Sequence, residues 1–468
     1  MKKNEKYIGE VERLGFNGEG ILFNDGVTVF LPFALPGEKV EYVVLKVDGK
    51  IAYAKLLEII TPSISRLKPI CPVFTKCGGC QLQHLKYKDQ LLLKAKTVSD
   101  CFSKIAFLSV DVLPCKYGKL EYGYRNKLQL PVREENGEVK IGFFANNSHR
   151  VVPISSCPIH PKWSGDIISA VKEFLAKSGT TAYNEATKRG TVKHIVVREV
   201  DKRLLITLVI TENKLDKSDI LIDILKSKFK DFSLFININK LDNNVIFGEK
   251  FITVFGKSKF TANELGVRYE MTPQSFMQIN DCMRGDLYKT AFEFSEADKD
   301  TTVIDAYSGA GLLTALFAQR CKRAIGIEIV KEAVECADAL KAENGLENME
   351  NVCAPCEDVL PEIIESLKGQ KTVLVLDPPR RGVDVKIIEA IKKSLPERIV
   401  YISCSPQTLA RDIGLLIGTL EVRNGITVKT ENPQKSTYSL TSVQPFDLFP
   451  QTKHTECVVK LSRAGLSE

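Results

Sequence analysis

Four cysteines carry the first chemical signal in the sequence. Cys71, Cys77 and Cys80 stand together in the stretch Cys71-Pro-Val-Phe-Thr-Lys-Cys77-Gly-Gly-Cys80, and Cys157 follows much later. The two glycines let the backbone curl, so that the sulfurs of Cys77 and Cys80 can face one centre. Four cysteine thiolates can bind either a zinc ion or a [4Fe–4S] cluster. The spacing therefore predicts a metal site and leaves the choice between zinc and iron–sulfur open.

A glycine turn supplies the second signal. Residues 303–311 read Val-Ile-Asp-Ala-Tyr-Ser-Gly-Ala-Gly, in which a strand ends at a turn containing Tyr307 and a helix begins. Small residues there let the backbone approach a ligand at the carboxyl end of the strand. Residue 314 is Thr, so the third glycine of a dinucleotide fingerprint is missing. Glu328, at the tip of the next strand, can accept hydrogen bonds from ribose hydroxyls, and the pattern predicts an adenosine-containing ligand.

Three further motifs lie at or near strand ends. Asp377 is followed by Pro378-Pro379 and two arginines, and the prolines hold its carboxylate toward the cleft. Cys404 directly precedes a predicted helix over 407–417, whose dipole is expected to lower the thiol pKa and favour a nucleophilic thiolate. Glu456, within His454-Thr-Glu456, is a candidate catalytic residue only if the fold brings it next to Cys404.

One further motif suggests a different function. Cys353-Ala-Pro-Cys356 has the spacing of a redox pair, so a thiol oxidoreductase is an alternative function. The pair follows a strand of the α/β pattern and lacks a thioredoxin-like context, which favours a structural or pocket-wall role.

The elements that position these residues fall into three regions. Short strands punctuated by glycines over residues 1–60 predict a five-stranded OB-like β-barrel. Residues 71–265 predict a central α+β domain that contains the four cysteines, with an amphipathic helix near 86–105 that could pack on the catalytic domain. Residues 266–468 alternate strand and helix and predict an α/β fold with a doubly wound parallel sheet. The segments 422–429 and 456–461 predict an antiparallel hairpin at its edge.

Composition bounds the class of protein. The chain has 468 residues, of which 44% are hydrophobic and 26% charged, and its net charge of +7 permits a polyanionic partner without requiring one. Thirteen cysteines without a signal peptide favour reduced thiols, metal ligands or catalysis over a disulfide framework. With no apolar run long enough to span a membrane, the expected location is the cytoplasm.

Taken together, these motifs resemble the RNA uracil-5-methyltransferase family, specifically its iron–sulfur members that act on 23S ribosomal RNA. The resemblance covers nearly the whole chain, and it implies a TRAM domain over residues 6–58 and a Rossmann-like methyltransferase domain. It implies that S-adenosylmethionine is the cofactor, in contact with Gln278, Tyr307, Glu328 and Asp377. It further implies a [4Fe–4S] cluster on Cys71, Cys77, Cys80 and Cys157, a nucleophile at Cys404 and a general base at Glu456. Leu312, Pro355 and Ser405 depart from the family pattern.

The implied reaction agrees with the chemistry of the motifs. Addition of a thiolate to C6 of uracil makes C5 nucleophilic, so C5 can attack a sulfonium methyl group, and a carboxylate then removes the C5 proton. Arg125 and Arg198 are expected to grip RNA around a flipped uridine. The expected enzyme is a monomer that binds 23S ribosomal RNA and no membrane. The motifs are also compatible with methylation of the T-loop uridine of transfer RNA, and with a zinc-containing RNA-binding protein without catalysis.

Overall fold

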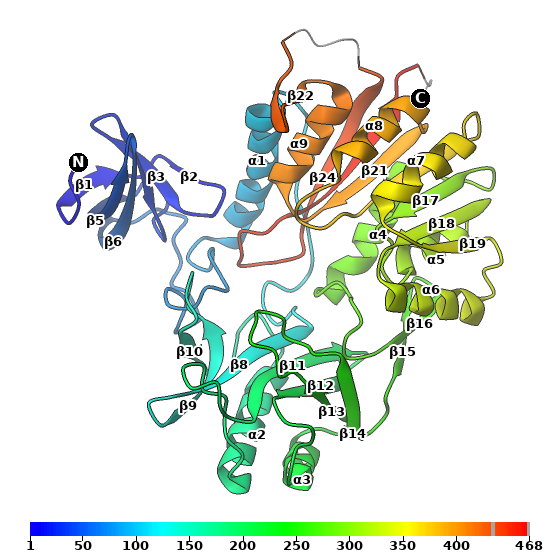
Figure 1. Cartoon of the computed structure of the whole chain (residues 1–468). Coiled ribbons are helices and arrows are strands. Elements are labelled where there is room, and N and C mark those ends of the chain that lie inside the picture. The colour runs from blue at the N-terminus through cyan, green and yellow to red at the C-terminus, as the bar shows by residue number, and fades with distance from the viewer. Residues whose placement is uncertain (432–435, 466–468) are drawn as a thin grey trace. The chain divides into compact units, whose positions relative to one another are not determined.

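The computed structural model describes residues 1–431 and 436–465 (Figure 1). The chain divides into two compact units. The first contains residues 1–93, 120–258 and 449–453, and the second contains residues 94–119, 259–448 and the described residues from 454 onwards. None of the helices in the described residues combines the length and apolar character needed to cross a membrane.

The N-terminal part of the first unit is a six-stranded sheet with the order β1-β5-β6-β4-β3-β2. Alternating burial along β5 places Val40, Tyr42 and Val44 in a small apolar core, as expected for strands with one buried face. The sequence predicted five strands closed into a barrel; closure stays a prediction. The strands are β1 (Lys6–Glu10), β2 (Arg13–Leu14), β3 (Gly20–Asn24), β4 (Val27–Leu31), β5 (Lys39–Asp48) and β6 (Ile51–Thr61).

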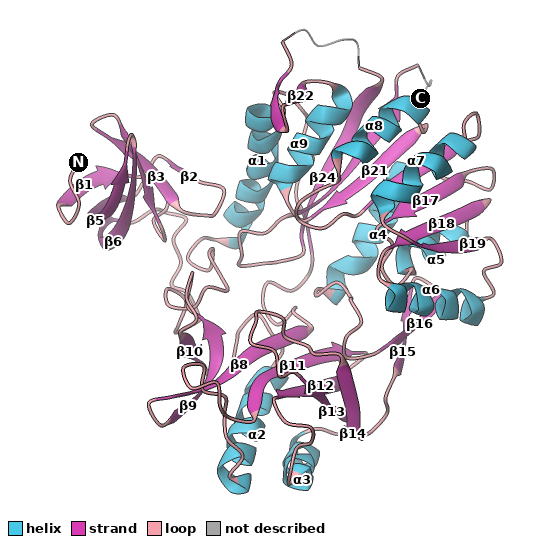
Figure 2. Ribbon diagram, viewed as in Figure 1, coloured by secondary structure: helices cyan, strands magenta, loops and turns pink. Residues whose placement is uncertain are grey.

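The second part of this unit is a seven-stranded sheet with the order β10-β9-β8-β11-β12-β13-β14, next to two helices (Figure 2). Apolar side chains of its central strands share one large core with α2 and α3. The sheet therefore has one covered apolar face, in agreement with the predicted α+β pattern. Its elements are β8 (Lys127–Glu135), β9 (Glu138–Phe144), β10 (Val151–Pro153), α2 (Trp163–Ser178), β11 (Val192–Val200), β12 (Arg203–Ile210), α3 (Ser218–Lys228), β13 (Phe232–Ile238) and β14 (Lys250–Phe255).

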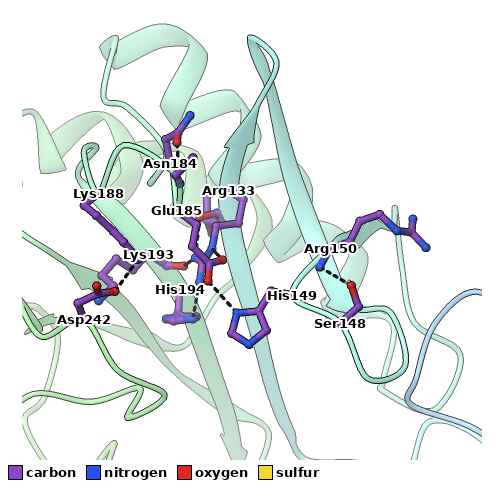
Figure 3. Close-up of polar contacts among 12 residues, drawn as sticks. Arg133, Ser148, His149, Arg150, Asn184, Glu185, Lys188, Lys193, His194 and Asp242 are labelled. Atoms are coloured by element: carbon purple, nitrogen blue, oxygen red, sulfur yellow. Dashed lines mark hydrogen bonds and ion pairs between the residues drawn. The ribbon is translucent and has the colours of Figure 1, made fainter.

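A polar network links the loop between α2 and β11 to β8 and to two other loops of this unit (Figure 3). The buried Arg133 guanidinium lies against the ring of Tyr183 and forms an ion pair with Glu185 at 3.5 Å. Glu185 also contacts His149 Nδ1 at 2.7 Å, and Lys188 pairs with Asp242 at 2.8 Å. These contacts tie four separate segments together.

The second unit is built on an eight-stranded sheet with the order β19-β18-β17-β20-β21-β25-β24-β7. The first five strands are parallel, and β25 and β24 extend the sheet in antiparallel fashion. The strands of the sheet are β7 (Lys116–Tyr117), β17 (Thr302–Ala306), β18 (Arg323–Glu328), β19 (Met349–Cys353), β20 (Thr372–Leu376), β21 (Arg398–Ser403), β24 (Tyr438–Asp447) and β25 (Glu456–Arg463).

The chain reverses its winding direction between β17 and β20. From β17 it runs outward through β18 to β19 and then returns to β20 on the other side of β17. Because such crossovers are right-handed, helices before and after the reversal cover opposite faces, and the crevice for ligands lies at the carboxyl ends of β17 and β20. In Figure 1, α7, α8 and α9 lie side by side across one face. The helices are α1 (Tyr87–Ile105), α4 (Asp281–Ser295), α5 (Leu312–Ala318), α6 (Lys331–Asn344), α7 (Cys356–Ser366), α8 (Val385–Ser394) and α9 (Pro406–Ile417).

The prediction that the segments 422–429 and 456–461 form one hairpin at the sheet edge is wrong for the first segment. β25 pairs with β24, whereas the segment 422–429 belongs to a separate two-stranded hairpin of β22 (Leu420–Arg423) and β23 (Ile426–Lys429). The cause is the Asn424-Gly425 turn, in which both residues have positive φ, of 52° and 76°. This turn folds the segment back on itself. A further hairpin, β15 (Phe260–Glu264) with β16 (Val267–Met271), precedes α4.

Candidate active site

The candidate active site is assembled by strand ends. Tyr307, Glu328, Asp377 and Cys404 directly follow or end β17, β18, β20 and β21, as the sequence predicted for this edge of the sheet. The register aligns Ala306 with Leu376, and the Asp377 amide donates to the Ala306 carbonyl at 3.4 Å. Four segments distant in sequence therefore present polar side chains at one edge.

The turn after β17 has the strained geometry that close approach to a ligand requires. Tyr307 has φ +67°, and Gly309 and Gly311 have φ +55° and +77°. A Cβ on Gly311 would stand 2.6 Å from Ala337 Cβ, so glycine is needed for α6 to pack here. Tyr307 is half-buried, and the turn lies at the reversal point of the sheet.

Glu328 is tied to this turn through its carboxylate. Its two oxygens accept hydrogen bonds from the amides of Gly309, at 3.0 Å, and Val330, at 2.9 Å. Each carboxylate oxygen has a further lone pair, so Glu328 can hold the turn and still accept a ribose hydroxyl.

Asp377 and Glu456 are carboxyl groups in surroundings that favour their neutral forms. Burial raises the pKa of Asp377 to about 7. Burial raises the pKa of Glu456 well above its ordinary value, and the nearby Asp377 raises it further, while Arg380 lowers it. Carboxyl groups whose pKa values are raised by burial and by a neighbouring charge are typical of a functional site.

The pairing of β21 with β25 brings Cys404 to Glu456. These antiparallel strands align Ser403 with Cys457, so Cys404 and Glu456 are the next residues outward at the same end of the two strands. The charge of Glu456 acts on the Cys404 thiol, as does that of Asp377. Cys404 and Glu456 are therefore neighbours in the structure, as the predicted mechanism requires.

The predicted lowering of the Cys404 pKa is wrong. Burial raises the pKa of this half-buried thiol, Glu456 and Asp377 raise it further, and Arg380 lowers it. The sequence showed the helix that follows Cys404 but not the two carboxyl groups beside it. Ser405, which departs from the family pattern, caps α9 by accepting a hydrogen bond from the Thr408 amide at 3.5 Å.

Gln278 lies in the segment between β16 and α4 and is half-buried. A cavity of about 280 Å³ opens beside Tyr307, with walls from the 381–385 segment, α9 and the β22–β23 hairpin. Gln278, Glu328 and Asp377 do not line this cavity. Of the predicted cofactor residues, Tyr307, Glu328 and Asp377 thus lie at strand ends of one sheet, only Tyr307 lines this cavity, and Gln278 lies in neither place.

The four cysteines of the first unit lie near one another. The thiols of Cys71, Cys77 and Cys80 all act electrostatically on Cys157, whose pKa is raised to about 12, mainly by burial. Burial likewise raises the pKa of Cys80 to about 11. Within the described residues, however, no group of three or more His, Cys, Asp or Glu side chains is arranged to hold a metal ion. The predicted metal centre is therefore not confirmed.

Two residues near the site were not assigned by sequence reasoning. Arg380 is near enough to Cys404 to lower the pKa of its thiol, although its position in the chain indicates only that it lies close to Asp377. Tyr288, on α4, is near enough for Asp377 to raise its pKa, after the larger effect of burial. No spacing signal links α4 to the end of β20. Cys353 and Cys356, the competing motif, are free thiols, one exposed and the other buried.

A sequence model described as tRNA (Uracil-5-)-methyltransferase matches residues 86–464. The chain belongs to this family. Within the tRNA (uracil-5-)-methyltransferase family, it is 37% identical over 99% of its length to an uncharacterized RNA methyltransferase of Clostridium tetani, of which it covers 98%. It is 36% identical, with the same coverages, to another of Clostridium acetobutylicum.

A solved member of known activity extends this comparison. The crystal structure of Pyrococcus abyssi tRNA (uracil-54, C5)-methyltransferase with S-adenosyl-L-homocysteine superimposes with a TM-score of 0.75 and 26% identity. The alignment covers 97% of this chain and 99% of that chain. The second unit therefore has the α/β fold of an S-adenosylmethionine-dependent methyltransferase, and the chain is an RNA (uracil-5-)-methyltransferase. The hypothesis of a thiol oxidoreductase is set aside.

Proposed function

We propose that this enzyme methylates C5 of a uridine in 23S ribosomal RNA through a covalent bond between Cys404 and C6 of the base. The observation that carries the mechanism is the register of β21 and β25, which puts a thiol and a buried carboxyl group side by side. In this proposal Gln278, Tyr307, Glu328 and Asp377 bind S-adenosylmethionine, which supplies an electrophilic methyl group when bound.

The residues of the chain act in sequence on the uracil ring. Cys404 loses its proton to solvent, and its sulfur bonds to C6 while the C5–C6 π pair moves toward O4 as an enolate. C5 then gains the methyl group and carries both a proton and a methyl. Glu456, as carboxylate, takes the C5 proton, the C6–S bond breaks, and its electron pair returns to sulfur. The raised pKa of Glu456 makes it a stronger base once it is ionised.

Substitution of the two residues tests this order of events. Cys404→Ala is expected to abolish methyl transfer from labelled S-adenosylmethionine to RNA, and retained turnover would end the mechanism. Glu456→Gln is expected to accumulate a covalent protein–RNA adduct that resists denaturing electrophoresis. A Glu456→Gln enzyme that releases product at the normal rate would remove Glu456 from the base role.

Cationic side chains of the central sheet support RNA binding. Lys127 and Arg198 stand directly opposite each other on β8 and β11, an arrangement of like charges that is unfavourable by itself. The pKa of Lys127 is lowered to about 8, first by burial and then by Arg198 and Arg125. A phosphate group of RNA would offset this repulsion. In the proposal, Arg125 and Lys127 contact the strand that flanks the flipped uridine, while Arg198, which is only 3% exposed, contributes positive charge from beneath.

Cys71, Cys77, Cys80 and Cys157 are proposed as ligands of a structural [4Fe–4S] cluster. The four thiols are close enough to raise one another's pKa values, and this proximity is what ligands of one shared cluster require. The ligands of a cluster bind different irons and therefore stand farther apart than the ligands of one zinc ion. Anaerobic purification should yield a brown protein with about four irons per chain; a colourless protein containing one zinc would contradict the proposal.

Transfer RNA is the second candidate substrate. The family resemblance favours ribosomal RNA, because it implies that tRNA-modifying relatives typically lack the N-terminal β-barrel and the cysteine cluster. The Pyrococcus abyssi enzyme, which its description assigns to uracil 54 of tRNA, aligns over nearly the whole of this chain, so the presence of an N-terminal region does not separate the two substrates. Mapping of 5-methyluridine in ribosomal and transfer RNA, with and without the gene, decides between them. Loss of the modification from tRNA alone would overturn the ribosomal assignment.

A further inference from the structure

The segment that carries Gln278 depends on its neighbours for its position. Residues 272–280 connect β16 to α4 and belong to no named helix or strand. The segment begins with a turn, in which the Thr272 amide donates to Ser275 Oγ at 3.0 Å. Gln278 is the one predicted cofactor residue that does not lie at a strand end. Whatever fixes the hairpin before the segment and the helix after it therefore decides where Gln278 stands.

The β15–β16 hairpin, which precedes the segment, is fastened to α6. Asn344, the last residue of α6, accepts a hydrogen bond from the Arg268 amide through Oδ1 at 2.9 Å. Its Nδ2 donates to the Arg268 carbonyl at 2.6 Å. One side-chain amide thus pairs with both backbone groups of a residue on β16. Because α6 begins shortly after Glu328, the hairpin is held by the part of the fold that carries the proposed ribose contact.

A largely buried ion pair joins this hairpin to the start of α4, the helix that follows the segment. Arg284 Nε donates to Glu264 Oε2 at 2.6 Å, and the two side chains are only 10% and 11% exposed. Nη1 of the same guanidinium donates to Asp281 Oδ1 at 2.7 Å. Two charge-assisted bonds from one planar group fix its orientation as well as its distance. Loss of Arg284 would leave the Glu264 carboxylate buried without this cation and would release α4 from the hairpin.

The residues on either side of Gln278 are anchored to the same elements. The Tyr269 hydroxyl, on β16, donates to Met277 Sδ at 3.7 Å, and Met277 is 6% exposed. Asn280, which directly precedes α4, is 1% exposed, and its Nδ2 donates to the Leu448 carbonyl at 3.2 Å. Gln278 lies between these two anchored residues, so a shift of α4 relative to the hairpin would move it.

We propose that Arg284, through its ion pair with Glu264, is a positioning residue that holds Gln278 in place for S-adenosylmethionine. The proposal rests on the proposed cofactor role of Gln278 and deepens it. Arg284 acts by keeping the start of α4 at a fixed distance from the β15–β16 hairpin. A side chain that is held before binding loses less conformational freedom when the ligand binds, so the ion pair strengthens cofactor affinity.

Calorimetric titration of the full-length protein with S-adenosyl-L-homocysteine measures the affinity of this site without turnover. Gln278→Ala removes a hydrogen-bonding side chain and is expected to raise Kd by about tenfold. Arg284→Gln is expected to raise Kd by about three- to tenfold, and Glu264→Gln by less, because Gln at 264 can still accept from Arg284. Glu296→Gln is the matched control: it weakens an ion pair with Arg398 at the other end of α4 and should leave Kd unchanged.

A double substitution separates positioning from a general loss of structure. If Arg284 acts through Gln278, Arg284→Gln should change Kd by less than about twofold in a protein that already carries Gln278→Ala. An equal change in both backgrounds, an unchanged Kd in Arg284→Gln alone, or an equal loss in Glu296→Gln would overturn the proposal. If Arg284→Gln does not fold by circular dichroism, Arg284→Lys, which keeps the charge but not the forked geometry, replaces it in the same comparison. Failure of the cofactor role of Gln278 would show separately, as a normal Kd in Gln278→Ala alone.

Discussion

Lys94 and Asp447 form a buried ion pair whose removal should be costly. Lys94 Nζ lies 2.5 Å from Asp447 Oδ1, and the two side chains are 1% and 0% exposed. The pair connects α1 to the end of β24, the strand whose Phe446 is aligned with Glu456. Lys94→Met keeps much of the length of the side chain but leaves the Asp447 carboxylate buried without this cation. Breaking one side of a buried pair costs about 3–5 kcal/mol.

Urea denaturation followed by far-ultraviolet circular dichroism measures this loss. The two compact units can unfold separately, so the transitions are fitted individually. Lys96→Met on the same helix is the control, because Lys96 is 66% exposed and pairs with Asp100 at 3.2 Å, and exposed pairs contribute less than about 1 kcal/mol. The double substitution Lys94→Met with Asp447→Leu should recover most of the loss. A Lys94→Met protein within about 1 kcal/mol of the parent would refute the reasoning.

Three other perturbations have defined outcomes. The methylation rate should increase as pH rises from about 6 to 9, because Cys404 and Glu456 must both lose protons and both pKa values are raised; a flat profile would count against their roles. Gly382→Ala should destabilise the protein by about 2 kcal/mol or more in urea unfolding, well beyond Gly369→Ala, since Gly369 has a similar φ of +81° but open space around it; equal losses would exclude the clash with Asp412. Glu328→Gln should raise KM for S-adenosylmethionine by about tenfold or more in initial-rate assays, with kcat little changed; an unaltered KM would remove the ribose contact.

The sequence predicts the position of functional residues well where they directly follow a strand. The apolar runs before Tyr307 and Cys404 predict strands over 302–306 and 398–403, and the structure has them with those bounds. The alternation of strands and helices indicates a parallel doubly wound sheet, and such a sheet gathers the carboxyl ends of its strands at one edge. The placement of these residues on one edge therefore required no long-range information.

What the sequence could not provide depends on contacts between distant segments. The pKa of Cys404 is raised by burial and by Glu456, and neither the depth of the thiol nor the pairing of β21 with β25 can be read from local patterns. The loop after β20 is held against α9 by the hydrogen bond from the Val383 amide to Asp412 and by the close approach of Gly382 to the same carboxylate, and local patterns reveal neither contact. The wrong hairpin partner of β25 has a local cause, since the Asn424-Gly425 dipeptide is itself a turn signal that separates the segment 422–429 from the sheet.

The most direct test of the mechanism uses RNA that contains 5-fluorouridine. The fluorine at C5 cannot leave as a proton, so after methyl transfer Glu456 has nothing to remove and the bond between Cys404 and C6 should persist. The wild-type enzyme, with S-adenosylmethionine present, is predicted to form a complex stable to denaturing electrophoresis, with the RNA attached to the peptide 399–411. A complex that forms equally well with Cys404→Ala, or an attachment at another residue, would contradict the account.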